Sequence, residues 1–347
     1  MPITSRKRTD ALPPPPPDVI CKALGIQHLT IEWLAGDGSD RCYYRILSSE
    51  LAQPLVLMQL SLSDAKKLEN NGYEWIQIGD LLSESRIFVP QTVCTLPEYA
   101  ALLIEDYGDL MMESQVKDYL GENATVEAFK LYERAIYIVR QMLNIQADPQ
   151  AVWCQRRFDQ ERFVWEMNFF AKHYLQQARN IFFNEREEAV FQKEVVELSK
   201  HLVSGPEVFV HRDFHSRNIM LRDERLALLD FQDARLGPAS YDLVSLVFDS
   251  YVPLTNESRL KILENGLEII RTDFPQHYED IQTRWQAMLL QRQLKAIGSF
   301  GYLSIEKRRG KYLDYVPKAL ETLDHTWVYD KRWPFLSEEL LARMRSN

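Results

Sequence analysis

The amino-acid sequence predicts an α+β protein with a small β-rich N-terminal lobe and a larger, mainly helical C-terminal lobe. Short β-prone runs are frequent before residue 106, whereas long stretches with helical periodicity dominate after residue 124. Between the helical stretches, residues 208–242 hold short apolar runs that end in polar residues. This is the pattern of buried strands that deliver side chains to a site.

The N-terminal lobe is expected to span residues 18–106 and to contain five strands and one helix. Before it, the proline run from Pro13 to Pro17 is stiff and lacks amide donors, so residues 1–17 are expected to form an extended, flexible arm. The first expected strand begins at Ile31, and the other four cover 42–47, 55–60, 87–93 and 99–104. The expected helix covers 65–83. Two glycines, Gly72 and Gly79, weaken the prediction of this helix.

The C-terminal lobe is expected to span residues 107–347. Its clearest helix is 124–146, where apolar residues spaced three and four apart form one stripe that packs against a core. Further helices are expected at 158–177, 185–201, 241–250, 257–271 and 281–297. Short apolar runs at 208–210, 219–221 and 226–229 are expected to be strands.

Composition bounds the class of protein and its partners. The chain has 347 residues and a net charge of −9, which argues against nucleic acid or an anionic membrane surface as the main partner. Its four cysteines lack metal-ligand spacing and suit a reducing cytosol, and no apolar run approaches the length of a membrane span. A cytoplasmic enzyme is therefore expected. A monomer is also expected, although no feature of the sequence bears on the oligomeric state.

Three polar residues of the central stretch have the types and the spacing that phosphoryl transfer requires. Asn218 lies five residues after Asp213, and Asp230 follows the next apolar runs. One carboxylate can orient the acceptor hydroxyl and take its proton, while an amide and a second carboxylate offer the oxygen ligands that Mg²⁺ prefers. Single acids in loops are usually caps or surface carboxylates, but three such residues at this spacing indicate a kinase site.

The same stretch carries a longer motif. It reads HRDFHSRN over residues 211–218, DFQDA over 230–234 and YDLVSL over 241–246. These residues resemble the catalytic loop and metal segment of the aminoglycoside phosphotransferase and choline kinase-like family, which shares the protein kinase fold. With GSDR at 38–41 and QRQLKAIG at 291–298, the pattern is similar to the bacterial anomeric kinases for N-acetylmuramate and N-acetylglucosamine, which act in peptidoglycan recycling.

The resemblance implies a two-lobed protein kinase-like fold, with ATP as co-substrate and Mg²⁺ as cofactor. By this resemblance Asp213 is the catalytic base, and Asn218 and Asp230 bind Mg²⁺. Asp242 resembles the buried aspartate that steadies the catalytic loop in this family. The N-terminal lobe is then the nucleotide-binding lobe, and the C-terminal lobe holds the catalytic residues and the acceptor.

Nucleotide contacts are expected at two places in the N-terminal lobe. The glycine- and serine-rich loop that holds Ser39 and Arg41 can place backbone amides over the phosphates. The segment from Glu105 to Tyr107 falls at the hinge, where backbone groups would meet the adenine ring.

One departure from the family concerns the lysine that many relatives carry on the third strand. Here the strand at 55–60 carries Met58 and Gln59 and no lysine. Arg41, Arg45, Lys66 and Lys67 are candidate replacements, and Arg41 is the hypothesis because it lies in the phosphate-covering loop itself.

The expected partners are ATP and a small-molecule sugar acceptor, which is expected to be an N-acetylated amino sugar with a free anomeric hydroxyl. N-acetylmuramate also carries a lactyl carboxylate, so its pocket should present a cation, and Arg217, Arg292 and Lys295 are available. Asp233 has three interpretations of similar weight: a second metal ligand, a contact to the acceptor, or a cap of the following turn. An aminoglycoside or choline/ethanolamine kinase is the alternative enzyme, and a non-catalytic nucleotide-binding pseudokinase is the alternative from another class.

Overall fold

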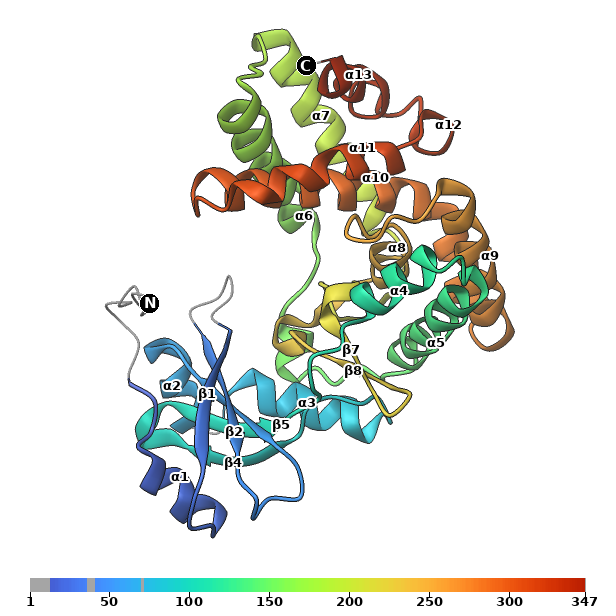
Figure 1. Ribbon diagram of the computed structural model, residues 1–347. Coiled ribbons are helices and arrows are strands. Elements are labelled where there is room, and N and C mark those ends of the chain that lie inside the picture. The colour runs from blue at the N-terminus through green and yellow to red at the C-terminus, as the bar shows by residue number, and fades with distance from the viewer. Residues whose placement is uncertain (1–12, 36–40, 70–71, 347) are drawn as a thin grey trace. The chain divides into compact units, whose positions relative to one another are not determined.

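The computed structural model describes residues 13–35, 41–69 and 72–346 (Figure 1). The chain divides into two compact units, which are described separately below. The first unit comprises Met1–Asp109 and Leu221–Gln232, and the second comprises Leu110–Met220 and Asp233–Asn347. The first division lies close to the predicted boundary at residue 106, but the return of a later segment to the first unit was not predicted.

A five-stranded antiparallel sheet forms the centre of the first unit, in the order β1-β2-β3-β5-β4. The predicted strands at 42–47 and 55–60 are confirmed, while the strand predicted at 87–93 is wrong over most of its length. Ile87 and Val89 are buried, whereas Phe88 is 44% exposed and forms a single bridge to Ala227 of the later segment. The strands are β1 (Thr30–Ala35), β2 (Cys42–Leu47), β3 (Leu55–Gln59), β4 (Thr92–Leu96) and β5 (Ala101–Glu105).

Three helices accompany this sheet: α1 (Pro17–Leu24), α2 (Leu62–Glu69) and α3 (Glu74–Glu84). The single helix predicted at 65–83 is wrong, because α2 and α3 are separate helices and Gly72 lies outside both. Glycine is the poorest helix former after proline, which favours a break there. The prediction for the arm also ends one residue too late, since proline is well tolerated at a first helical position and Pro17 begins α1.

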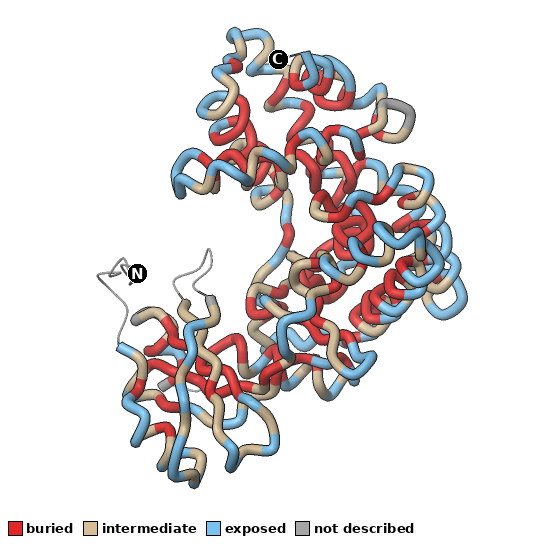
Figure 2. Tube along the Cα trace, viewed as in Figure 1, coloured by how far each residue is buried: buried red, intermediate tan, exposed pale blue. Residues whose placement is uncertain are grey.

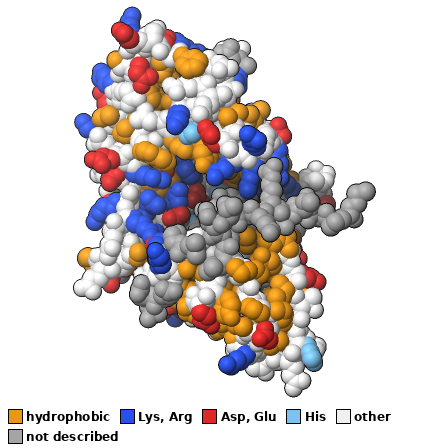
Figure 3. Space-filling model, turned by 90° about the vertical axis from the view of Figure 1, so that its left-hand side faces the viewer, with side chains coloured by type: hydrophobic (Ala, Val, Ile, Leu, Met, Phe, Trp, Pro, Cys, Tyr) orange, Lys and Arg blue, Asp and Glu red, His pale blue; other side chains and the backbone are white. Residues whose placement is uncertain are grey.

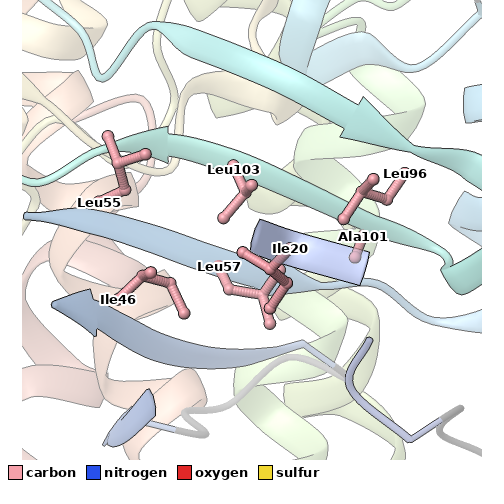
Figure 4. Packing of buried hydrophobic residues seen from close by; sticks show 7 residues of the cluster. All are labelled: Ile20, Ile46, Leu55, Leu57, Leu96, Ala101 and Leu103. Carbon is pink, nitrogen blue, oxygen red and sulfur yellow. The ribbon is translucent and has the colours of Figure 1, made fainter. Parts of the chain in front are cut away.

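One hydrophobic cluster of the first unit lies on one face of the sheet (Figure 4). Residues two apart on a strand point to the same face, so Leu55 and Leu57 of β3 lie beside Ala101 and Leu103 of β5. Ile20 of α1 completes the cluster and is fully buried. The helix that follows the proline run is therefore part of the fold of this unit.

The second unit is mainly helical, as predicted, and the helices expected at 124–146, 185–201 and 257–271 are confirmed. The one expected at 158–177 divides into α6 and a π-helical segment, Ala171–Ala178. The helices are α4 (Met112–Gly121), α5 (Thr125–Leu143), α6 (Gln160–Phe170), α7 (Glu185–Leu202), α8 (Tyr241–Val247), α9 (Asn256–Asp273), α10 (Pro275–Ile305), α11 (Val316–Thr322), α12 (His325–Val328) and α13 (Leu340–Ser346).

Two short strand pairs flank the central stretch. β6 (Glu207–Val210) pairs antiparallel with β9 (Arg235–Pro238), and β7 (Ile219–Arg222) pairs with β8 (Arg225–Leu228). The three strands expected from the apolar runs of this stretch are confirmed, and β9 was not predicted. The residues between β6 and β7 are therefore held at both ends by strands.

Helix α10 runs through the second unit, and most of its middle part is buried (Figure 2). Two glycines allow it to approach the segment formed by α6 and the π-helical turn. A Cβ atom at Gly298 would lie 2.6 Å from Cα of Phe170, and one at Gly301 would lie 2.6 Å from the carbonyl oxygen of His173. This close packing fixes the position of the side chains that α10 carries. Within the described ranges, none of the helices has the length and apolar composition that crossing a membrane requires.

Candidate active site

The catalytic loop follows β6 and is anchored by a buried carboxylate from α8. Asp242 accepts hydrogen bonds from the backbone N–H of His211, at 2.6 Å, and of Arg212, at 3.2 Å. Arg212 itself adopts a left-handed backbone with φ of 85°, which is uncommon for a residue other than glycine. Asp242 thus holds a strained turn directly before Asp213, the role that the resemblance implied.

Asp213 lies in a cationic environment. Lys295 of α10 places its Nζ 3.2 Å from Oδ1, and Nε of Arg212 lies 3.6 Å from Oδ2. Burial by itself would raise the pKa of Asp213, but the charges of Lys295, Arg212 and Arg292 outweigh it and hold the pKa well below 3.8. The carboxylate is therefore ionised at neutral pH, as a base that accepts a proton must be.

A cavity of about 190 Å³ opens beside Asp213 within the second unit. Carboxylates, cations and aromatic side chains all line it. The lining includes Asp213, His215, Ser245, Asp249, Tyr251, Arg292, Lys295, Ser299 and Phe300.

Arg292 is a buried cation on the wall of this cavity. The residue is 7% exposed, its Nε donates to Oγ of Ser245 at 2.8 Å, and one terminal nitrogen donates to Oη of Tyr241 at 2.6 Å. Both partners are neutral, and burial raises the pKa of Tyr241 well above 10. Among the described residues, Arg292 has no carboxylate within 4.0 Å.

Asn218 and Asp230 belong to different units, and each has a fixed side chain. Nδ2 of Asn218 donates to the carbonyl oxygen of Asp213 at 2.9 Å, which turns its oxygen away from that contact. Asp230 has a left-handed backbone with φ of 61°, and its Oδ1 accepts a hydrogen bond from Gln232 at 2.7 Å. An amide oxygen and a carboxylate are hard oxygen donors, so both residues fit Mg²⁺ by their chemistry.

The cations of the first unit are largely paired with carboxylates. Arg41 lies 3.4 Å from Asp64 of α2, while Lys67 lies 2.9 Å from Glu74 of α3. Arg45 contacts two carboxylates, Asp106 at 2.6 Å and Asp109 at 2.9 Å, so its charge is compensated by them. Ser39, in the loop expected to cover the phosphates, lies outside the described residues.

The expected hinge lies at the end of β5. Oε2 of Glu105 accepts a hydrogen bond from the backbone N–H of Gln91 at 3.2 Å, and its own N–H donates to the carbonyl of Gln91 at 3.0 Å. Tyr107 is half-buried, and the guanidinium of Arg222 lies 5.7 Å from its ring centroid.

Two other predicted acceptor contacts have partners of their own. Arg217 forms hydrogen bonds to both oxygens of Glu113 and to the hydroxyl of Tyr315. Asp233 lies 2.8 Å from Arg212 and has a half-exposed side chain. The first contact neutralises Arg217, so it is less suited than Arg292 to bind an acidic acceptor.

Three residues around the loop were not predicted. Asp249 accepts hydrogen bonds from the backbone and side chain of Ser216. Ser245 accepts a hydrogen bond from Arg292, and Glu113 accepts one from Arg217. Single polar residues in apolar or mixed segments carry no distinguishing pattern.

Figure 3 shows one face of the molecule on which Lys and Arg side chains gather, although the chain as a whole is acidic.

Comparison with known proteins agrees with the fold and the motif. The model of the phosphotransferase enzyme family matches residues 30–279. The N-acetylmuramate/N-acetylglucosamine kinase of Neisseria meningitidis serogroup B is 34% identical over 301 residues, which cover 84% of this chain and 84% of that protein. An ADP-bound aminoglycoside phosphotransferase gives a TM-score of 0.57 at 14% identity, covering 92% of this chain and 97% of the other. A choline kinase from Streptococcus pneumoniae gives a TM-score of 0.54 at 14% identity, and the match covers 88% of this chain and 97% of the other.

The solved structures show that the fold is the one of the aminoglycoside phosphotransferases and choline kinases, a protein kinase-like fold. The family model and the relative from Neisseria meningitidis define the class of protein as a small-molecule kinase. The chain belongs to the phosphotransferase enzyme family, and its co-substrate is ATP. The predicted fold class, the resemblance and the assignment as a phosphotransferase with an alcohol group as acceptor are confirmed.

Proposed function

We propose that this protein uses ATP to phosphorylate the anomeric hydroxyl of N-acetylmuramate and N-acetylglucosamine in the recycling of the cell wall. The relative from Neisseria meningitidis supports this substrate class, because it is named for both sugars. The observation that carries the proposal is the cavity beside Asp213, where a buried arginine without a carboxylate partner among the described residues faces the same space. A cytoplasmic location agrees with the use of ATP.

In this proposal Asp213 is the catalytic base. The oxygen of the sugar hydroxyl forms a bond to the γ-phosphorus, the bond from that phosphorus to the bridging oxygen breaks, and the electron pair leaves on ADP. The proton of the hydroxyl passes to Asp213 and then to solvent. Because the transition state is loose and an anomeric hydroxyl is relatively acidic, positioning and charge neutralisation supply most of the acceleration.

Asn218 and Asp230 are the residues that would hold Mg²⁺. Bound Mg²⁺ neutralises charge on the phosphate oxygens and orients them. Backbone groups of Glu105 and Tyr107 are proposed to contact the adenine ring, and Ser39 is proposed to contact the phosphates. Arg217 and Asp233 stay predicted acceptor contacts.

Arg292 is proposed to bind the lactyl carboxylate of N-acetylmuramate. A buried cation is unfavourable without a compensating anion, and a charge-assisted hydrogen bond to an acceptor carboxylate would supply one. N-acetylglucosamine lacks this carboxylate, so the same contact would make no difference to it. Arg292 would therefore contribute to the binding of N-acetylmuramate and not to that of N-acetylglucosamine.

The test is a panel of acceptors with released ADP as the readout. Wild-type protein is expected to turn over both N-acetylated sugars, and Arg292→Met to raise the KM for N-acetylmuramate by about 10- to 100-fold, because a charged hydrogen bond is worth about 1.5–3 kcal/mol. N-acetylglucosamine serves as the matched control and should keep its KM within about threefold. Equal losses for both sugars would contradict the role of Arg292. Turnover of an aminoglycoside or choline alone would contradict the proposed function.

Arg41 is proposed to contact the phosphates of ATP in place of the missing strand lysine. The expected result for Arg41→Ala is a KM for ATP that rises by about tenfold, since one charge-assisted contact is lost, with the KM for the sugar unchanged. Arg41→Lys keeps the charge and is expected to recover part of the loss. An unchanged KM for ATP in Arg41→Ala would refute this role.

A further inference from the structure

Lys295 carries a partly buried ammonium group, and among the described residues the hydrogen-bond acceptor of that group is Asp213. Its side chain is 15% exposed, and Nζ donates to Oδ1 of Asp213 at 3.2 Å. An ammonium group has three N–H donors. In the described part of the chain, Asp213 is the acceptor for one of them, and no acceptor is present for the other two.

Both residues face the cavity of about 190 Å³. In the proposed function, the acceptor hydroxyl lies there within hydrogen-bond reach of Asp213, about 2.6–3.2 Å. The attacked phosphorus lies about 3–3.5 Å beyond that hydroxyl oxygen. Nζ is also 3.2 Å from this carboxylate, and both residues line the same cavity, so an acceptor bound on the cavity side of Asp213 would bring the oxygens of the transferring phosphoryl group toward its remaining donors.

The other cations considered for the phosphates are engaged differently. Arg41, Arg45 and Lys67 form ion pairs with carboxylates of the first unit. The third strand, β3, carries no lysine. Lys295 differs from these cations because its partner is the base, so its charge is held at the reacting atoms.

We propose that Lys295 is a catalytic residue that donates hydrogen bonds to the transferring phosphoryl group as charge develops on its oxygens. It takes no proton, and the proton of the acceptor still passes to Asp213. The inference rests on the proposed function, because it places the acceptor hydroxyl at Asp213. Donors aimed at developing charge are worth about 10²- to 10³-fold in kcat.

A simpler role would be to position Asp213, and a double-mutant cycle separates the two roles. The cycle compares kcat for wild type, Lys295→Met, Asp213→Asn and the double variant. Lys295→Met is expected to lower kcat by about 10²- to 10³-fold while leaving the KM of the sugar within about threefold. The double variant is expected to fall at least about tenfold below Asp213→Asn alone, because the contact to the phosphoryl group is lost independently.

The result that overturns the inference is a double variant equal to Asp213→Asn, since Lys295 would then act only through the base. Lys172→Met, at an exposed lysine of the same unit, is the matched control and should keep the wild-type kcat. If Lys295→Met lowers the Tm, Lys295→Gln takes its place in the cycle. The two failures are distinguishable. The proposed function fails if the wild-type protein turns over neither sugar. The inference fails if the wild-type protein is active but the double variant has the same kcat as Asp213→Asn.

Discussion

Asp213→Asn is expected to lower kcat by about 10²- to 10⁴-fold, because an amide cannot take the proton of the acceptor hydroxyl. Lys295 and Arg212 would keep their positions around a side chain of the same shape, so the binding of ATP should persist. The measurement is steady-state release of ADP with N-acetylmuramate, together with calorimetric titration of ATP. Asp223→Asn, the same change at a side chain that is 85% exposed, is the control. Full turnover by Asp213→Asn would refute the assignment of the base.

The pH dependence of the wild-type enzyme follows from the same environment. The pKa of Asp213 is held well below 3.8 by Lys295, Arg212 and Arg292, against the effect of burial. The base therefore stays ionised as the pH falls to about 4, and kcat should show no acid limb from this group above that pH. Because the folded pKa is depressed, the ionised carboxylate also contributes stability above its unfolded pKa, and this contribution is lost as the pH falls through the folded pKa.

The second large effect is expected at Asp242. In Asp242→Ala, the backbone N–H groups of His211 and Arg212 lose their buried acceptor, which should destabilise the fold by about 2–6 kcal/mol at about 1–3 kcal/mol for each group. Activity should fall as well, because these two residues directly precede Asp213. Urea unfolding and kcat measure the two effects, and unchanged stability would contradict the anchoring role.

Asp242→Asn tests the charge of the same anchor. Burial raises the pKa of Asp242 to about 7, above its usual value of 3.8, although two N–H groups oppose the shift. A raised folded pKa contributes stability that is fully present below the unfolded pKa and is lost as the pH rises through the folded pKa. Wild-type stability relative to Asp242→Asn is therefore expected to decline between about pH 4 and pH 7. If the difference in free energy of unfolding between wild type and Asp242→Asn does not change with pH, the raised pKa of Asp242 is contradicted.

The sequence was sufficient for the fold class and for the residues of the catalytic loop, because periodicity and local motifs are properties of short segments. It predicted β2, β3, β6 and most long helices, and it placed Asp213 and Asn218 in one loop. It was not sufficient for the pairing of side chains from distant segments. Lys295 meets Asp213 across 82 residues of chain, and Arg217 meets Glu113 across 104. Such contacts depend on how helices pack, for which the local sequence has no pattern.

The break between α2 and α3 shows the same limit at short range. Apolar spacing continued across Gly72, so one helix was predicted, and the glycine was treated as a weakness within it. In the structure the glycine lies between two helices, where Lys67 of the first and Glu74 of the second form an ion pair. Helical spacing on both sides of a glycine is therefore compatible with two helices as well as with one.

The return of Leu221–Gln232 to the first unit has a consequence for biosynthesis. Phe231 packs on Trp75, with ring centroids 4.4 Å apart, and Ala227 bridges to Phe88. A ribosome delivers the chain from its N-terminus, so the β-rich unit cannot complete its packing when Asp109 emerges. It must wait until Gln232 has left the exit tunnel, after the catalytic loop has been made. Completion of the β-rich unit is thereby coupled in time to translation of the loop that holds Asp213 and Asn218.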